Sequence, residues 1–527
     1  MQRRTHSGDG GMNTVPANRR FIVWVGVAAL ALRLFRLGHQ SLWVDELLTL
    51  IVATPKPGYP ILQLLAHNVH GPLYTAVVFV FRSISENDLW LRLPSALAGA
   101  AAVPVVYLWV RRWVGENAGR YTAVLLAVNP LHLRYSQELR GYAFVFLFGV
   151  LACYLLERMQ GRAREGVQPE PDRWRPPLLY AVAMAGAALS SFTAAFLYAC
   201  HSIIWFLRRG LRPRQWVQWA LIALVILVLI SPWVYRLSTY IDMGRLVTPV
   251  APGQLTTEHR LRGETTITPA VIPYAFYTYG AGFTLGPSLR ELHTDASFAA
   301  VLRRHLVPIL WVALLFGGLA GAGLFRAIRG RMRWAEMLVY LLVPIGLTLA
   351  LNWQNAKAFN VRYVMLGLPV YLALIAIALD AAGPRIRVFL GGALVLTSLV
   401  SLGNHYFNGD YARADVRAAV RHIEKQSEGM NAAGESMCIV APTVFHVVQH
   451  YYDGRAPVHP VFGEGVPEES VTRQLDTVFA ACNEVWYVRA RPWVDDADGA
   501  IAAAFLDRYT LVETTRFHGV ELMRLSR

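Results

Sequence analysis

Charge is scarce in this chain of 527 residues, and lysine is nearly absent. Charged residues make up 16% of the sequence, against roughly 25% in soluble domains, while hydrophobic residues make up 55%. This balance, with many long apolar runs, excludes an ordinary soluble protein and indicates a polytopic membrane protein. The only lysines are Lys56, Lys357 and Lys425, so the net charge of +15 comes almost entirely from arginine.

The arginines cluster between the apolar runs. Cytoplasmic loops of membrane proteins show this pattern, so a membrane topology explains the basic charge better than nucleic-acid binding does. We therefore expect membrane lipid as a partner and no nucleic acid.

Motifs of soluble enzymes are also missing. The chain has no GxxxxGK[ST], GxGxxG or HExxH motif, which leaves a nucleotide-driven pump or nucleotide-sugar site without support. The four cysteines lack zinc-site spacing. Cys153 and Cys200 lie inside apolar runs and are expected only to pack. Cys438 and Cys482 lie near the C-terminus and could pair if that region is exported.

The apolar runs predict about eleven transmembrane helices. They fall at about 21–37, 94–110, 120–134, 142–156, two within 178–207, 216–234, 306–325, 335–351, 364–379 and 388–403. An odd count puts every dense arginine cluster on one side, with the N-terminus in the cytoplasm and the C-terminus outside. The run at 73–81 is short for a crossing and predicts a helix on the outer membrane surface, or else a short span.

These runs divide the chain into three parts. Residues 1–19 are expected to form a disordered cytoplasmic tail, and residues 20–405 a transmembrane domain whose first external loop is 38–93. Residues 406–527 alternate between strand-like and helix-like segments. Strands are expected at 437–441, 485–488, 510–514 and 519–523, and helices at 412–425, 471–480 and 500–508. The alternation predicts a small extracytoplasmic α/β domain.

Two adjacent carboxylates, Asp45 and Glu46, directly follow the first apolar run. Ionisable residues at a membrane boundary suggest a functional site, and a positioned carboxylate can accept the proton of an acceptor hydroxyl. Because neighbours on a helix point in different directions, we expect one of them to be the base and the other to bind a metal or an arginine. The alternative is a surface pair that caps a short interfacial helix.

Further candidates lie on the same external side. Arg140, with Glu138 beside it, and Arg362, with Tyr363 and Lys357 nearby, are suited to hold a lipid phosphate and to take up its charge as it leaves. The alternatives are a snorkelling Arg140 paired with Glu138 and an interfacial belt anchor at Arg362.

His70 precedes Gly71-Pro72-Leu73-Tyr74 in the same external segment as Asp45. It could contact a phosphate, a metal or a sugar, although a lone histidine is more often a structural residue.

Taken in order, four motifs resemble a known family. They are Asp45-Glu46, His70-Gly71-Pro72-Leu73-Tyr74, Tyr135-Ser136-Gln137-Glu138-Leu139-Arg140 and Arg362-Tyr363. Together they resemble bacterial membrane glycosyltransferases of the GT-C fold, above all the dolichyl-phosphate-mannose protein mannosyltransferase group (family 39). Lipid A aminoarabinose transferases and oligosaccharyltransferase catalytic subunits are more distant relatives. The likeness covers about residues 20–405.

The resemblance implies inverting transfer of a sugar from a polyprenyl-phosphate donor to a glycan, lipid or protein, at the outer face of a bacterial inner membrane. Asp45 matches the catalytic aspartate, Glu46 its partner, and Arg362 the phosphate-contacting basic residues. Glu138 and Arg140 match the polar stretch of the second loop, and His70 and Tyr74 the binding motif of the first. The C-terminal region looks like the exported domain of bacterial members, which puts a protein acceptor in doubt.

No cofactor is certain. A divalent cation, Mg²⁺ or Mn²⁺, is possible because Asp45, Glu46, Glu138 and His70 offer oxygen and nitrogen ligands. Two other classes of protein stay open: a lipid-linked sugar transporter or flippase, and a non-catalytic envelope-assembly protein. A transporter tends to place charges mid-membrane and to carry inverted repeats, and the sequence shows neither.

Overall fold

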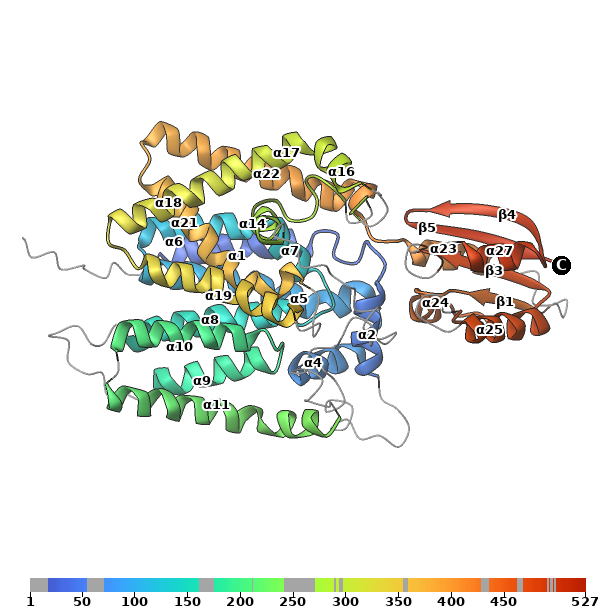
Figure 1. Cartoon of the computed structure of the whole chain (residues 1–527), viewed down its shortest axis with the longest axis horizontal. Helices are drawn as coiled ribbons and strands as arrows, with labels where there is room; N and C mark the ends of the chain where they lie inside the picture. The colour runs from blue at the N-terminus through green and yellow to red at the C-terminus, as the bar shows by residue number, and fades with distance from the viewer. Residues whose placement is uncertain are drawn as a thin grey trace, which may run out of the picture.

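The computed structural model describes two parts of the chain, a bundle of helices and a smaller α/β domain beside one end of it (Figure 1). The described residues are 18–54, 71–160, 175–210, 212–240, 271–288, 291–292, 297–353, 359–427, 436–461, 468–490, 492, 496 and 499–527. His70, Lys357 and almost all of the predicted tail lie outside these ranges.

Most helices of the bundle follow the predicted apolar runs, whereas α2, α14 and α16 lie outside them. Its elements are α1 (Arg19–Leu34), α2 (Val44–Val52), α4 (Pro72–Arg82), α5 (Asp88–Trp113), α6 (Glu116–Ala127), α7 (Pro130–Ser136), α8 (Tyr142–Gln160), α9 (Arg175–Ala188), α10 (Ala194–Arg209), α11 (Pro213–Tyr240), α14 (Val271–Ala281), α16 (Phe298–Arg304), α17 (Leu306–Val312), η3 (Ala313–Gly317), α18 (Gly318–Arg329), α19 (Trp334–Trp353), α20 (Val361–Val364), η4 (Met365–Gly367), α21 (Leu368–Asp380) and α22 (Pro384–Phe407).

The protein is a multi-pass membrane protein. Within the described residues, seven helical segments are long and apolar enough to cross a bilayer: 88–113, 142–160, 213–238, 306–329, 334–353, 361–380 and 384–407. The short helices α20 and η4 lead directly into α21, and this segment is almost wholly buried. In contrast, α11 and α22 expose much of their apolar surface. The remaining predicted spans coincide with shorter helices, so the count of eleven stays a prediction.

Two of the predicted runs are interrupted. The run at 120–134 forms two helices because Asn129 caps α7 by accepting a hydrogen bond from the His132 N–H, and Pro130 takes the first position of that helix. The run at 178–207 turns around Ser190 and Ser191, as its sequence predicts. The short run at 73–81 forms the 11-residue helix α4.

A buried arginine fixes the end of α1. Arg33 of α1 is fully buried, and its guanidinium donates to the carbonyls of Ala29 and Ala127 and, at 2.7 Å, to Nδ1 of His132. Gln137 then donates to the carbonyls of residues 33 and 35. The end of α1 is thereby tied to the loop that carries Arg140.

The C-terminal domain is a five-stranded sheet in the order β2-β1-β3-β5-β4. Its strands are β1 (Met437–Val440), β2 (Val458–His459), β3 (Glu484–Arg489), β4 (Thr510–Phe517) and β5 (Val520–Ser526). Its helices are η5 (Gly409–Tyr411), α23 (Val416–Ser427), α24 (Phe445–Tyr451), α25 (Glu468–Ala481) and α27 (Ala500–Leu506). In this order β1 pairs in parallel with β2 and β3, whereas β5 is antiparallel to both β3 and β4. The predicted α/β domain is confirmed.

Alternate strand residues point to opposite faces of this sheet. Ile439 and Trp486 belong to a core with α23 and α24, whereas Val440 and Tyr487 pack against α25 and α27. The first of these cores also contains Leu47 of α2. One continuous apolar core therefore joins the domain to α2, the helix that carries Asp45.

Polar contacts reinforce this junction. The Tyr451 hydroxyl accepts a hydrogen bond from the Leu42 N–H at 2.8 Å and donates to the Asp88 carboxylate at 2.6 Å. Arg417 forms an ion pair with Asp88 at 2.8 Å, and the Ser41 hydroxyl donates to the carbonyl of residue 414. The domain thus holds the loop between α1 and α2 in place.

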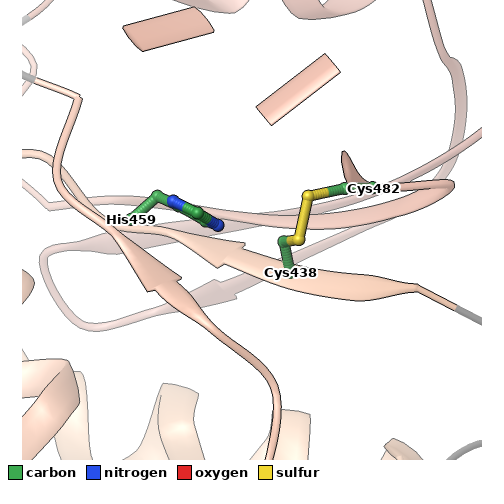
Figure 2. Close-up of side chains that lie close together, drawn as sticks. All are labelled: Cys438, His459 and Cys482. Carbon is green, nitrogen blue, oxygen red and sulfur yellow. A yellow bond between two sulfur atoms is a disulfide. The ribbon is translucent and has the colours of Figure 1, made fainter. Parts of the chain in front are cut away.

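A disulfide closes the sheet domain. Cys438 in β1 is bonded to Cys482 just before β3, with 5.8 Å between the Cα atoms, and His459 of β2 lies beside it (Figure 2). Cys153 and Cys200 are buried free thiols.

Replacing both half-cystines, as Cys438→Ser/Cys482→Ser, is expected to destabilise the domain by roughly 3–4 kcal/mol, because the bond closes a long loop in the unfolded chain. Urea unfolding, followed by proteolysis of the C-terminal domain, measures this loss. Reductant should reproduce it in the wild type and add nothing in the double variant. Alkylation of residues 438 and 482 in the unreduced protein would contradict the pairing.

Candidate active site

The site is built around the first turn of α2. The Trp43 N–H donates to the Glu46 carboxylate at 3.2 Å, while the Glu46 and Leu47 N–H groups donate to the Trp43 carbonyl. A carboxylate at this position caps the helix, and the positive end of the helix dipole favours it. The two adjacent carboxylates then diverge: Glu46 points into the protein and Asp45 toward a partly open site.

Glu46 is fully buried and fully engaged. Arg92 donates to its two oxygens at 2.8 and 2.7 Å, Arg413 donates at 2.6 Å, and the Leu139 N–H donates at 2.7 Å. Burial alone would raise the pKa of this carboxyl, but Arg413 and Arg92 outweigh it and lower the pKa to about 2. Glu46 is therefore ionised, and both of its carboxylate oxygens accept hydrogen bonds from these groups.

Asp45 and Glu46 were both catalytic candidates, and in this geometry Glu46 is the one that binds arginines, as the sequence predicted for one of the pair. A carboxylate with no exposed surface cannot reach a substrate, because contact with a reacting atom needs hydrogen-bond distance. Glu46 instead joins α2, α5, the second loop and the C-terminal domain at one point. Its contacts favour a positioning role.

Asp45 faces the arginines that the sequence placed on the same side. Its Oδ2 lies 3.1 Å from Nη1 of Arg362 and 3.9 Å from Nη2 of Arg140. Its side chain is 27% exposed, against 6% for Arg140 and 18% for Arg362. Arg140 also donates to the Asp45 carbonyl at 2.9 Å and to the Thr49 hydroxyl. The structure thus brings together three charged residues from α2, the second loop and the start of α20.

Aromatic rings support both arginines. The guanidinium of Arg362 lies 5.3 Å from the centroid of the Tyr142 ring and 5.4 Å from that of Tyr363. Arg140 lies 5.8 Å from the same Tyr142 ring. Such cation–π contacts restrict where the guanidinium can point, so Arg140 and Arg362 converge on the region in front of Asp45.

Glu138 lies next to this group but does not face Asp45. It is buried, its Oε2 is 3.5 Å from Nη2 of Arg413, and its Oε1 has no hydrogen-bond partner among the described residues. Burial raises the pKa of its carboxyl, and the nearby Arg413 only partly opposes that shift. The expected alternative of an ion pair with Arg140 is not seen, because Arg140 turns toward Asp45.

The remaining predicted residues contribute less to the site. Tyr74 is buried, and its hydroxyl is hydrogen-bonded to the Ser95 hydroxyl at 2.7 Å, inside the core between α4 and α5. Its place favours a structural role over contact with substrate. Tyr363 contributes its ring to Arg362. His70 and Lys357 are outside the described residues.

Sequence reasoning missed Arg92 and Arg413. Arg92 stands at the start of an apolar run, where arginine is usually an interfacial anchor. Arg413 follows the last predicted span and falls within the predicted C-terminal domain. No local pattern pairs either of them with Glu46, which is 46 and 367 residues away, respectively.

The described residues around Asp45 place two arginines beside it and no second free carboxylate that could share a metal ion with it. Glu46, a predicted metal ligand, is occupied by arginines. The described Cys, His, Asp and Glu residues form one group with closely spaced ligand atoms, Cys438, His459 and Cys482, in which the two sulfurs form the disulfide (Figure 2). A divalent cation at Asp45 stays a prediction.

A cavity of about 520 Å³ adjoins the site between the bundle and the C-terminal domain. Trp43 and Val44, which directly precede Asp45, line it together with Arg134, Phe283 and Arg413. Its walls combine aromatic rings with cationic and polar groups.

Solved structures share this architecture over nearly the whole chain. The apo structure of ArnT from Cupriavidus metallidurans aligns with 96% of this chain and 98% of its own, at a TM-score of 0.58 and 14% identity. The oligosaccharyltransferase of Archaeoglobus fulgidus aligns with 89% of this chain and 69% of its own, at 0.52 and 14% identity. The chain has the GT-C fold.

Other comparisons agree with the GT-C fold. A structure of the Cupriavidus ArnT bound to undecaprenyl phosphate aligns with 96% of this chain and 98% of its own, at a TM-score of 0.55 and 15% identity. The family profile described as dolichyl-phosphate-mannose-protein mannosyltransferase matches residues 69–235 of this GT-C chain. No curated protein sequence matches it significantly.

Proposed function

We propose that this protein is a glycosyltransferase that moves a sugar from a polyprenyl-phosphate donor to a hydroxyl of a cell-envelope acceptor, with inversion at the anomeric carbon. The observation that carries the proposal is the convergence of Asp45 with Arg140 and Arg362. It supplies a carboxylate and two cations in one partly open site at the end of a membrane bundle. The GT-C neighbours that bind undecaprenyl phosphate and dolichol phosphate support a lipid-linked donor.

In this reaction Asp45 accepts the proton of the acceptor hydroxyl as its oxygen attacks the anomeric carbon. The bond between that carbon and the phosphate oxygen breaks, and the electron pair leaves with polyprenyl phosphate. The phosphate changes from a singly charged diester to a monoester of higher charge. Arg362 and Arg140 stabilise that added charge because they are already in place before it develops.

Asp45 forms an ion pair with Arg362. A donor phosphate competes for Arg362, and Asp45 is then freed to contact the acceptor hydroxyl. The adjoining cavity, which begins at Trp43, offers space for an acceptor beside Asp45. The reaction is proposed to take place at the outer face of a bacterial inner membrane, on the side of the C-terminal domain.

A labelled polyprenyl-phosphate sugar tests the class of protein. Purified protein in vesicles should convert the label into a new glycoconjugate when envelope acceptors are supplied. Movement of label across the bilayer without a new product would indicate a flippase. Neither movement nor product would indicate an assembly protein. Either of these outcomes would overturn the proposal.

Arg362→Ala is expected to weaken binding of polyprenyl phosphate by roughly tenfold to hundredfold, since a hydrogen bond to a charged group contributes about 1.5–3 kcal/mol. Titration of the purified protein with undecaprenyl phosphate measures this. Arg362→Lys should recover part of the affinity because it keeps the charge and loses the planar fork.

The matched control is Arg304→Ala, which removes an exposed arginine that pairs with Glu291. It should leave the affinity unchanged. Unchanged affinity in folded Arg362→Ala protein would exclude Arg362 from the phosphate site.

A further inference from the structure

A second polar cavity lies at the other end of the bundle, away from Asp45 and the C-terminal domain. There α8 and α10 end, and α11 and α19 begin (Figure 1). The cavity has a volume of about 340 Å³. The described residues that line it are Gln160, Arg208, Arg209, Arg212, Gln215 and Arg333, none of them acidic.

Two of the four arginines are balanced by buried acids behind the cavity. Arg208 forms ion pairs with Glu157 and Glu336, and Arg333 pairs with Glu157 at 2.7 Å. Both glutamates are buried. This network connects α8, α10 and α19 and accounts structurally for Arg208 and Arg333.

Arg209 and Arg212 have no such partner. Within the described residues neither forms an ion pair, and Arg209 lies 4.9 Å from the ring centroid of Trp205. With Arg208 and Arg333 matched by Glu157 and Glu336, these two arginines give the described lining of the cavity an excess of positive charge. An anion is the ligand that this charge balance favours.

The cavity also holds an unused hydrogen-bond donor. The side-chain oxygen of Gln160 accepts from Arg208, while its buried amide nitrogen has no partner among the described residues. A buried donor without a partner is costly. An oxygen-rich anion in the cavity would accept from this nitrogen and from the arginines together.

An apolar surface begins directly beside the cavity. Phe206 and Leu207 precede its arginines on α10, and Trp216 and Val217 follow on α11; all four are exposed. The rest of α11 exposes Leu221, Leu224 and Val228 along the bundle. In a membrane protein such an apolar face contacts lipid. A lipid whose charged headgroup occupies the cavity can therefore place its acyl chains against this face.

We infer that this cavity binds the phosphate headgroup of an anionic phospholipid from the leaflet at this end of the bundle, with the acyl chains along α11. Basic clusters at the ends of membrane helices attract anionic lipid headgroups. The polar cavity and the apolar surface beside it provide a defined binding site for such a headgroup and its acyl chains. The site is far from Asp45 and does not depend on the transfer reaction.

The test compares lipids on the full-length protein in detergent. Dioleoyl phosphatidylglycerol should raise the melting temperature more than dioleoyl phosphatidylcholine does, and it should be retained in native mass spectra. In Arg209→Ala/Arg212→Ala the retention of phosphatidylglycerol should fall at least fivefold. Both side chains lie outside the ion-pair network of Arg208 and Arg333, so folding should be preserved, as size-exclusion chromatography would show. Arg209→Gln/Arg212→Gln repeats the test with polar side chains.

The matched control is Arg326→Ala/Arg329→Ala, which removes two exposed arginines of α18 that do not line this cavity. It loses the same charge and should retain phosphatidylglycerol. Equal loss in both double variants would show general attraction to basic loops and overturn a specific site. An equal rise in melting temperature with inorganic phosphate alone would identify a soluble anion as the ligand and overturn the lipid assignment. Unchanged retention in the Arg209 and Arg212 double variants would also overturn it.

Discussion

Asp45→Asn should lower the rate of sugar transfer by about 10²–10⁴-fold, the usual contribution of a positioned general base. Asparagine has nearly the same shape as aspartate, but its amide cannot accept the proton of the acceptor hydroxyl. The Asp45 side chain is partly exposed, and among the described residues its ion-pair partners are Arg362 and Arg140. We therefore expect the variant to fold and to keep its melting temperature within a few degrees.

The variant also separates catalysis from binding. Because Asp45 competes with a phosphate for Arg362, its neutral replacement should bind polyprenyl phosphate as tightly as the wild type or more tightly. The loss should thus appear in kcat, measured by single-turnover transfer with saturating donor. A loss confined to KM would make Asp45 a binding residue rather than the base.

Asp453→Asn is the matched control. Asp453 is an exposed aspartate of the C-terminal domain, and the same chemical change there should leave transfer unaltered. Transfer by folded Asp45→Asn protein at the wild-type rate would refute the proposed mechanism.

Glu46→Gln should destabilise the protein by about 3–5 kcal/mol, the range for removing one partner of a buried ion pair. The substitution leaves Arg92 and Arg413 as buried cations without their common carboxylate, and it weakens the cap of α2. We expect the first external loop and the C-terminal domain to separate from each other. Urea unfolding and protease sensitivity around residues 38–54 would report this loss.

The effect should depend on pH in a defined direction. The pKa of Glu46 in the folded protein, about 2, is lower than its ordinary value near 4.5. Its ionised form therefore stabilises the fold fully above pH 4.5, and this contribution declines as the pH falls toward 2. The difference in unfolding free energy between wild type and Glu46→Gln should be larger at pH 7 than at pH 3.

Glu116→Gln provides the comparison. Glu116 also pairs with two arginines, Arg111 and Arg120, but its side chain is 28% exposed. Pairs open to solvent contribute about 0–1 kcal/mol, so this variant should lose far less stability. A Glu46→Gln protein as stable as Glu116→Gln would show that the buried cluster does not hold the loop.

Much of the fold was readable from local pattern. Long apolar runs predicted the helices of the bundle because a membrane segment must satisfy its backbone internally and its side chains must be apolar throughout. Strand–helix alternation predicted the C-terminal domain. The two-residue strand β2 and the helix α24 were missed, since elements so short show little periodicity.

The site was readable only in part. The sequence by itself determined that Asp45, Arg140 and Arg362 lie at the ends of apolar runs on one side of the membrane, because hydropathy and arginine clusters fix which loops share a side. It did not determine how Asp45 and Glu46 divide their roles. Only the tertiary structure decided this, by bringing Arg92 and Arg413 onto Glu46 and leaving Asp45 to Arg140 and Arg362. The reason is that a carboxylate's role depends on which cations reach it and on whether water can, and both follow from contacts between residues far apart in the chain.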